Sequence, residues 1–142
     1  MALIRILIVD DFLLWRSEVI SILERNSEFQ IIGEASDGLE AVHKSAELQP
    51  DLILLDVGLP KLNGIEAARQ ILEIAPGSKI AFLSENSFPE LVQEALKLGA
   101  KAYIIKSEAA SDLLPAVKAV LEGRQFVSSR LAGCTFPSTP VR

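Results

Sequence analysis

The sequence has a single cysteine, Cys134, so no disulfide can form within the chain and a cysteine-rich zinc module is excluded. The apolar stretch from Leu3 to Val9 is too short to span a bilayer, is interrupted by Arg5, and precedes two aspartates rather than a small-residue cleavage site. Positive charge is also scarce: 14 lysines and arginines face 19 aspartates and glutamates, and the formal net charge is −5. This balance disfavours nonspecific binding to nucleic acid and to anionic membranes. We therefore expect a cytoplasmic protein that binds neither directly.

The chain does have enough apolar residues for one core. It contains 142 residues, of which 49% are hydrophobic and 23% charged, which is typical of a single globular domain. Short, continuous apolar runs alternate with longer segments in which apolar residues recur three and four positions apart. The runs predict parallel strands covered by helices on both faces. The predicted strands are Ile4–Val9, Phe29–Glu34, Leu52–Leu55, Lys79–Leu83 and Ala102–Ile105, and the predicted helices are Leu13–Arg25, Leu39–Leu48, Gly64–Ile74, Phe88–Leu98 and Ser111–Glu122.

Five strand–helix units favour an α/β, flavodoxin-like fold, with a doubly wound five-stranded parallel sheet in the order 2-1-3-4-5. Local signals support the helix boundaries. Asp37, Asn63 and Ser87 each stand three residues before a glutamate, which predicts a side-chain cap at three helix starts. Gly99 and Gly123 stand where two helices should end.

The last nineteen residues, from Arg124, contain two prolines and no helical period. We therefore expect one folded domain over residues 1–126 and a loose tail over residues 127–142. A helix-turn-helix module needs several helices, and these residues are too few to supply them.

Polar residues follow four of the five predicted strands. Asp10 and Asp11 follow the first, Asp56 the third, Ser84 the fourth and Lys106 the fifth. Because the carboxyl ends of parallel strands share one edge of the sheet, we expect these side chains to converge. Clustered carboxylates repel one another unless a cation joins them, and a few hard oxygen ligands favour Mg²⁺ over Zn²⁺. The first strand is followed by no glycine-rich phosphate loop, which weakens a nucleotide-binding interpretation.

As a set, these residues resemble the receiver domain of two-component response regulators over about residues 3 to 126 of this chain. The matching segments are Val9-Asp10-Asp11, Asp56 through Glu66, Ser84, and Tyr103-Ile104-Ile105-Lys106. The segment Ala35–Ala41 is most similar to receivers that precede helix-turn-helix output domains. We expect this chain to keep the receiver and lack that output domain. The alternative, that it is the receiver part of a longer DNA-binding transcriptional regulator, stays open.

The resemblance implies that Asp56 accepts a phosphoryl group from a phosphohistidine on a sensor histidine kinase or phosphotransfer protein. It assigns the Mg²⁺ ligands to Asp10, Asp11, Asp56 and the backbone carbonyl of Gly58. It also implies that Ser84 and Lys106 bind phosphoryl oxygens. The catalysis would be confined to the protein's own phosphorylation and dephosphorylation, so the protein is not expected to be an enzyme acting on a separate metabolite.

The resemblance further implies a switch, in which a shift of Ser84 is accompanied by reorientation of Tyr103. The surface that changes would comprise Glu90–Leu98, the strand that carries Tyr103, and Ser111–Glu122. We expect a downstream protein or a second copy of the chain to bind there.

Three departures from the family pattern bear on these expectations. Glu85 follows Ser84, where the family usually has a small residue that leaves room for the phosphodonor. Ser107 follows Lys106, where most receivers carry a proline after a cis peptide bond. Gly58 and Asn86 occupy two variable positions that tune the loss of the phosphoryl group.

Two other residues and two other functions need an interpretation. His43 lies within a predicted amphipathic helix and is interpreted as a surface residue, while Trp15 is interpreted as core or flank. A magnesium-dependent aspartyl phosphatase would need a second aspartate two residues after the nucleophile, where this chain has Gly58. A pseudo-receiver, which is not phosphorylated, would be expected to lack one or more of the five site residues. All five are present, and Glu85 is the reason to keep this alternative.

Overall fold

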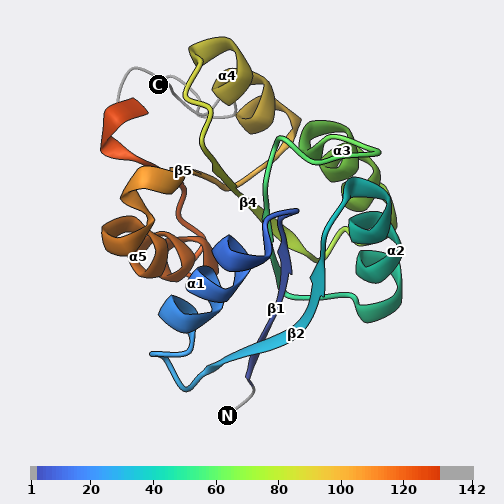
Figure 1. Ribbon diagram of the computed structural model, residues 1–142, viewed down its shortest axis with the longest axis horizontal. Helices are drawn as coiled ribbons and strands as arrows, with labels where there is room; N and C mark the ends of the chain where they lie inside the picture. The colour runs from blue at the N-terminus through green and yellow to red at the C-terminus, as the bar shows by residue number, and fades with distance from the viewer. Residues whose placement is uncertain (1–2, 132–142) are drawn as a thin grey trace.

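A parallel sheet of six strands forms the centre of the protein in a computed structural model that describes residues 3–131 (Figure 1). The strand order is β2-β1-β3-β4-β5-β6, and all neighbouring strands run parallel. The strands are β1 (Ile4–Val9), β2 (Phe29–Ala35), β3 (Leu52–Leu55), β4 (Lys79–Ser84), β5 (Ala102–Ile105) and β6 (Phe126–Val127). The helices are α1 (Leu13–Leu23), α2 (Gly38–Leu48), α3 (Gly64–Ile74), α4 (Pro89–Leu98) and α5 (Ala109–Leu121), with 3₁₀ turns η1 (Lys106–Glu108) and η2 (Ser129–Leu131). The predicted fold and the order of the first five strands are confirmed.

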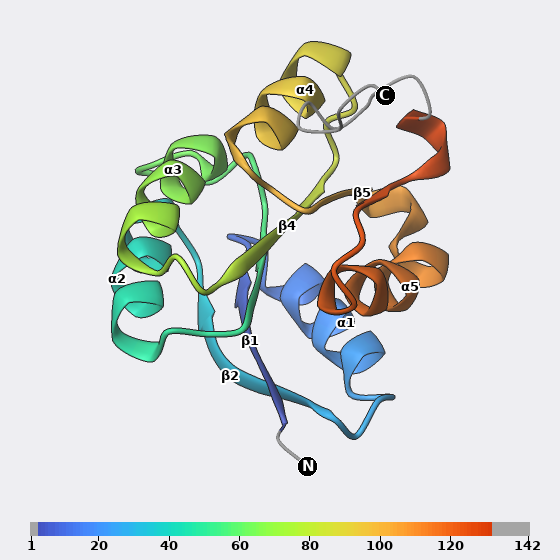
Figure 2. The ribbon, with the colours of Figure 1, turned by 180° about the vertical axis from the view of Figure 1, so that it is seen from behind.

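Helices cover both faces of the sheet (Figures 1 and 2). On one face α2, α3 and α4 pack against Ile53 and Leu55 of β3, and on the other α1 and α5 pack against Leu52 and Leu54 of the same strand. Successive side chains of a strand point to opposite faces, so a strand covered on both sides is apolar at every position. All four residues of β3 and all four of β5 are buried. This arrangement explains the continuous apolar runs of the sequence.

Two of the three predicted helix caps are confirmed. The Asp37 carboxylate accepts a hydrogen bond from the backbone N–H of Glu40 at 2.8 Å, and the Asn63 side chain accepts one from Glu66 at 2.9 Å. Each bond satisfies an amide that the first turn of a helix leaves without a backbone partner. Both caps stand beside the site edge of the sheet, at the start of α2 and of α3.

The predicted cap at Ser87 is wrong. Phe88 occupies the N-cap position of α4 and makes no side-chain cap bond. The helix begins with Pro89, which is favoured at the first helical position because it has no N–H to satisfy. The N–H of Phe88 instead donates to the side chain of Asn86 at 2.9 Å.

The chain after α5 packs onto the fold through residue 131, which corrects the expectation of a loose tail from residue 127. The backbone N–H of Ser128 donates to the carbonyl of Tyr103 at 3.1 Å, next to the β5–β6 pairing. The fully buried Ser128 hydroxyl accepts from the N–H of Ile105 at 3.0 Å and donates to Asp112 at 2.9 Å. Leu131 is also buried, in the core on the face of the sheet that α2, α3 and α4 cover.

A two-residue strand has no periodic signal of its own, because its pairing depends on the free edge of β5. The sequence therefore could not reveal this segment. The rest of the predicted tail, residues 132–142 with Cys134, lies outside the described residues.

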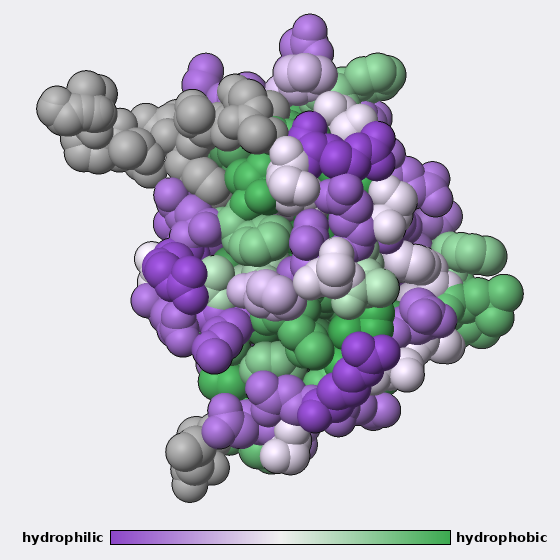
Figure 3. All heavy atoms as spheres, turned by 90° about the vertical axis from the view of Figure 1, so that its left-hand side faces the viewer, coloured by the Kyte–Doolittle hydropathy of each residue, from purple (hydrophilic) through white to green (hydrophobic). Residues whose placement is uncertain are grey.

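Within residues 3–131, no helix combines the length and apolarity needed to cross a bilayer. Figure 3 shows the side of the molecule on which α5 lies, where apolar surface is visible between polar side chains. The large apolar side chains that are exposed in the described residues are Leu3, Phe12, Leu13, Leu14, Leu39, Ile74 and Phe88.

Candidate functional site

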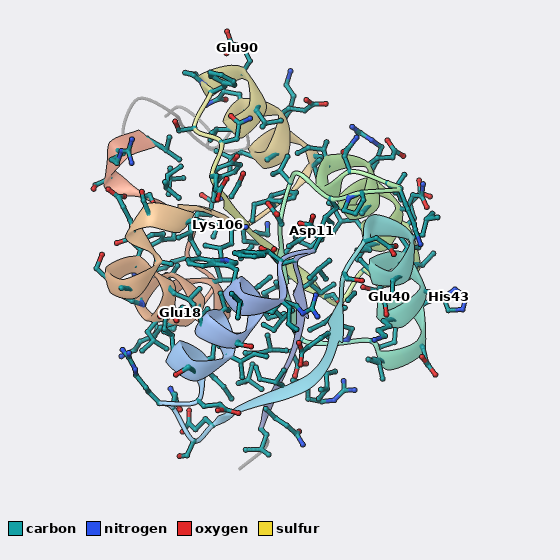
Figure 4. All side chains as sticks on the ribbon, viewed as in Figure 1. Asp11, Glu18, Glu40, His43, Glu90 and Lys106 are labelled. Carbon is teal, nitrogen blue, oxygen red and sulfur yellow. The ribbon has the colours of Figure 1, made fainter. Side chains whose placement is uncertain are left out.

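The predicted strand-end residues meet at one edge of the sheet and line a cleft of about 630 Å³. Asp10 follows β1, Asp56 follows β3, Ser84 ends β4 and Lys106 follows β5. Asp10, Asp56 and Ser84 are buried, whereas Asp11 is exposed at the mouth of the cleft. Figure 4 shows Asp11 and Lys106 at this same edge. The structure thus brings together all five side chains.

Lys106 bridges two of the carboxylates. Its Nζ atom lies 2.6 Å from Oδ2 of Asp10 and 3.3 Å from Oδ2 of Asp56. The three side chains are only 10%, 4% and 10% exposed, respectively, so water screens these contacts weakly. The ammonium therefore compensates part of the negative charge that the two strand ends bring into the cleft.

The pKa values of Asp56 and Lys106 are both raised. Burial is the main cause for Asp56, whose pKa the nearby Asp10 raises further, and the opposing charge of Lys106 does not cancel these effects. For Lys106, burial would lower the pKa, but the hydrogen bond to Asp10 and the charges of Asp56 and Asp10 outweigh it. The folded protein therefore favours a charged Lys106 and penalises a charged Asp56.

Backbone amides of the adjoining loops hold the two buried carboxylates. The N–H of Phe12 donates to Oδ1 of Asp10 at 2.9 Å, and the N–H of Gly58 donates to Oδ1 of Asp56 at 3.3 Å. Gly64, at the start of α3, brings its N–H within 2.7 Å of the carbonyl of Val57. Its Cα lies so close to the backbone of Asp56 that a Cβ there would stand 2.0 Å from the Asp56 carbonyl oxygen.

The carboxylates also fit a divalent cation. Asp10, Asp11 and Asp56 each present one oxygen within 4.8 Å of the others. Oxygen donors of this kind, few in number and open to water on one side, suit Mg²⁺. The donor set therefore agrees with the ion expected from the sequence.

A chain of hydrogen bonds joins Ser84 to Tyr103. The N–H of Asn86 donates to Oγ of Ser84 at 3.0 Å, and the carbonyl of Asn86 accepts from the Tyr103 hydroxyl at 2.7 Å. The Tyr103 ring is fully buried and lies 6.0 Å from the ring of Phe82, measured between centroids. Asn86 therefore contacts both residues that the sequence predicted to form a switch.

The structure shows the surroundings of three residues at which the chain departs from the family pattern. Glu85 is exposed and lines the cleft beside Ser84. The peptide bond between Lys106 and Ser107 is trans. Gly58 leaves open space, since a Cβ at that position would have no atom within 4 Å. His43 is exposed on α2 and points away from the cleft (Figure 4).

Two residues of α1 contact the site without having been predicted as part of it. The Arg16 side chain donates to the backbone carbonyl of Asp10 at 2.5 Å and pairs with Glu34 at 2.9 Å. The ring of Trp15, which was expected to be core or flank, lies beneath Lys106, with Nζ 5.4 Å from its centroid. Their position in the sequence could have indicated this. When a helix follows a strand, its first turn lies beside the end of that strand, and Trp15 and Arg16 belong to the first turn of α1 after β1.

The parallel sheet with an acidic cleft at its carboxyl edge places the protein in the flavodoxin-like class of α/β folds. A family model described as the response regulator receiver domain matches residues 6–118, a span that contains every strand-end residue of the cleft. The chain belongs to the receiver family of two-component response regulators.

Curated relatives agree with this assignment. The transcriptional regulatory protein DegU of Brevibacillus brevis is 36% identical over 128 residues, which cover 90% of this chain and 54% of DegU. The chemotaxis protein CheY of Thermotoga maritima is 38% identical over 116 residues, which cover 82% of this chain and 96% of CheY. The chain thus spans only about half of DegU but nearly all of CheY.

Solved structures show the same fold. A LuxR-family two-component response regulator from Aurantimonas sp. SI85-9A1 superposes with a TM-score of 0.88 at 30% identity, over 93% of this chain and 94% of that one. The response regulator domain of Thermotoga maritima CheB superposes with a TM-score of 0.78 at 32% identity, over 84% and 97% of the two chains.

Proposed function

We propose that this chain is a receiver switched by phosphorylation of Asp56, with a phosphohistidine on a sensor histidine kinase or phosphotransfer protein as the donor. The observation that carries this proposal is the buried Asp56 carboxylate, 3.3 Å from the Lys106 ammonium and in one cleft with Asp10, Asp11 and Ser84. A carboxylate is a competent nucleophile, and phosphoryl transfer depends mainly on positioning and charge compensation.

In the proposed step, an oxygen of Asp56 forms a bond to phosphorus while the P–N bond of the donor breaks. The electron pair of that bond stays with the imidazole, which takes up a proton from water. Lys106 Nζ is already beside the reacting carboxylate and can pair with a phosphoryl oxygen. The Ser84 oxygen accepts a bond from Asn86, so its own O–H remains to donate to another phosphoryl oxygen.

The charges of the site favour a bound cation. At the strand ends, the three carboxylates of Asp10, Asp11 and Asp56 against the one ammonium of Lys106 leave two formal negative charges. Asp10, Asp11, Asp56 and the backbone carbonyl of Gly58 would hold Mg²⁺, which when bound supplies the positive charge that a transferring phosphoryl group requires. Because Lys106 lies 2.6 Å from Asp10, we expect it to move away from this carboxylate when the cation binds.

The proposed switch is carried by Asn86. A Ser84 hydroxyl drawn toward the phosphoryl group would strain its bond to the N–H of Asn86, and the same residue holds the Tyr103 hydroxyl through its carbonyl. Release of Tyr103 would alter the surface formed by α4, β5 and α5. The packed segment 126–131 lies along β5, so a downstream protein or second copy would also contact that segment.

The mouth of the cleft suits a protein donor. Phe12, Leu13, Leu14 and Phe88 are 59%, 60%, 72% and 67% exposed, respectively. Phe12 and Phe88 line the cleft itself, and Leu13 and Leu14 begin α1 beside it. Large apolar side chains gathered around a polar cleft are typical of an interaction surface.

The test of the proposed function is intact-protein mass after incubation with phosphoramidate, with and without Mg²⁺. We expect a gain of one phosphoryl group with Mg²⁺ and little or none after chelation. A wild-type protein that gains no phosphoryl group under either condition would support the pseudo-receiver alternative.

Replacement of Glu85 with alanine is expected to speed phosphorylation by phosphoramidate by about two- to five-fold. The exposed carboxylate lies in the cleft beside Ser84, where it repels an incoming anion through partly solvated surroundings. Mass measured over a time course would give the rate. Glu47→Gln, which removes an exposed charge on α2, is the matched control. An unchanged or slower rate for Glu85→Ala would show that this side chain does not hinder access.

A further inference from the structure

Trp15 lies beside the site, between the core and the acidic cleft. It lies in the first turn of α1, half-buried against the core formed with α5. One side of the residue faces a hollow of about 300 Å³ that it shares with Lys106 and Ser107. This hollow adjoins the acidic cleft through Lys106, which lines both.

The ring face of Trp15 is turned to a cation whose side chain is mostly shielded from water. Lys106 Nζ lies 5.4 Å from the ring centroid, within the range of a cation–π contact. The same ammonium contacts Asp10 and Asp56 and has a side chain only 10% exposed. Two carboxylates and one aromatic face thus contact the ammonium and shield most of it from water. Cation–π attraction is strongest where the cation is desolvated in this way.

The indole N–H and the ring face of Trp15 differ in their contacts. A buried tryptophan usually finds a hydrogen-bond acceptor for this group. Here Nε1 is buried and has no partner among residues 3–131. Among the described residues, the electron-rich face against Lys106 is therefore the directed contact of Trp15 that an aliphatic residue at this location would lack.

We propose that Trp15 is a positioning residue for Lys106. The ring holds the ammonium beside Asp10 and Asp56 in the unphosphorylated protein. Because the ring face is broad, the ammonium keeps this contact while it moves from Asp10 toward a phosphoryl oxygen. This inference rests on the proposed function, since it concerns how Lys106 reaches the phosphoryl group on Asp56.

The contact itself is tested without metal or phosphodonor. Trp15 is the only tryptophan, so the protein gives one indole N–H signal in a ¹H–¹⁵N NMR spectrum. We expect Lys106→Met to shift this signal in metal-free protein. Lys101→Met, which removes an exposed ammonium before β5, should leave it unchanged. An identical indole signal in wild type and Lys106→Met would overturn the proposal.

The positioning role is tested with two substitutions of Trp15. Trp15→Leu should slow phosphorylation by phosphoramidate about five-fold, the change that corresponds to the ~1 kcal/mol of a cation–π contact. Trp15→Phe keeps an aromatic face and should stay within about two-fold of wild type. Urea unfolding of both variants establishes that each is folded under the assay conditions.

A calorimetric titration with Mg²⁺ separates positioning from general damage to the site. Lys106 is expected to leave Asp10 when the cation binds, so loss of the ring contact should not weaken the cation site, and Trp15→Leu should bind Mg²⁺ at least as tightly as wild type. Equal slowing by Trp15→Phe and Trp15→Leu, or a loss of Mg²⁺ affinity that parallels the slower rate, would contradict the positioning role. A wild-type protein that takes up no phosphoryl group would overturn the proposed function, whereas the metal-free indole comparison still decides the contact.

Discussion

Asparagine in place of Asp56 is expected to abolish uptake of a phosphoryl group from phosphoramidate. The amide has nearly the shape of the carboxylate and can still accept the hydrogen bond from the N–H of Gly58. It lacks the negatively charged oxygen that would attack phosphorus in the proposed step, so the expected loss is chemical rather than structural. Intact mass should show no added phosphoryl group over the time in which wild type is fully modified.

Glu47→Gln serves as the control, because it removes a carboxylate on the exposed side of α2. This variant should be phosphorylated at the wild-type rate. A gain of mass in Asp56→Asn would mean that another group is the acceptor. Peptide mapping would then distinguish Asp10 or Asp11 in the cleft from the distant His43.

The same substitution has an expected effect on stability in the absence of metal. The pKa of Asp56 is raised above its ordinary value of 3.8, chiefly by burial. The folded state therefore binds this proton more tightly than the unfolded chain does, and stability falls as the pH rises through the raised pKa. Asp56→Asn removes this cost, so it should be more stable than wild type in urea at neutral pH. The difference should vanish as the pH is lowered below about 3.8. An equal difference at both pH values would contradict a raised pKa.

Alanine in place of Gly64 is expected to destabilise the fold by about 3 kcal/mol or more. A Cβ at this position would lie 2.0 Å from the carbonyl oxygen of Asp56 and 2.7 Å from the Cα of Val57. Both neighbours are backbone atoms, so no side chain can rotate away. The start of α3 would have to move from the loop that carries Asp56, and the 2.7 Å hydrogen bond from Gly64 to Val57 would be lost.

Gly58→Ala is the matched control for stability, because it lies in the same loop and its Cβ would meet no atom within 4 Å. Urea unfolding should give a much lower midpoint for Gly64→Ala and a midpoint near wild type for Gly58→Ala. Any folded Gly64→Ala should also be phosphorylated slowly, since the shift displaces Asp56. Equal midpoints for the two variants would show that α3 can move without cost.

The correctly predicted elements are those whose sequence pattern is contained in a few consecutive residues. A strand such as β3, covered on both faces, must be apolar at each position, and the Asp37 and Asn63 caps act over three residues. The wrong predictions concern segments in which two neighbouring residues favour different helix starts, or in which a strand depends on a pairing partner far away in the sequence. Pro89 shifts the start of α4 past Ser87, and β6 forms only because β5 offers a free edge.

The candidate site divides in the same way. Asp10, Asp56 and Lys106 could be grouped from the sequence because parallel strands deliver their ends to one edge. The sequence does not show that Lys106 bridges Asp10 and Asp56, because these contacts depend on side-chain paths across 50 residues or more of chain. The contact of the Trp15 ring with Lys106 was missed for the same reason. The bond from Arg16 to Asp10 joins residues only six apart, and it was missed because it depends on the path of a long side chain at the start of α1.

By itself the sequence determined the class of fold, the edge of the sheet that carries the site, and the residue types available there. Periodicity and strand-end position are local properties, so they can be recognised from neighbouring residues in the sequence. Only the tertiary structure decided which atoms meet: the ammonium of Lys106 between two carboxylates, Asn86 between Ser84 and Tyr103, and Gly64 against the backbone of Asp56. Such contacts require atoms of separate elements to lie within a few ångströms of one another, and packing of the whole core sets those distances.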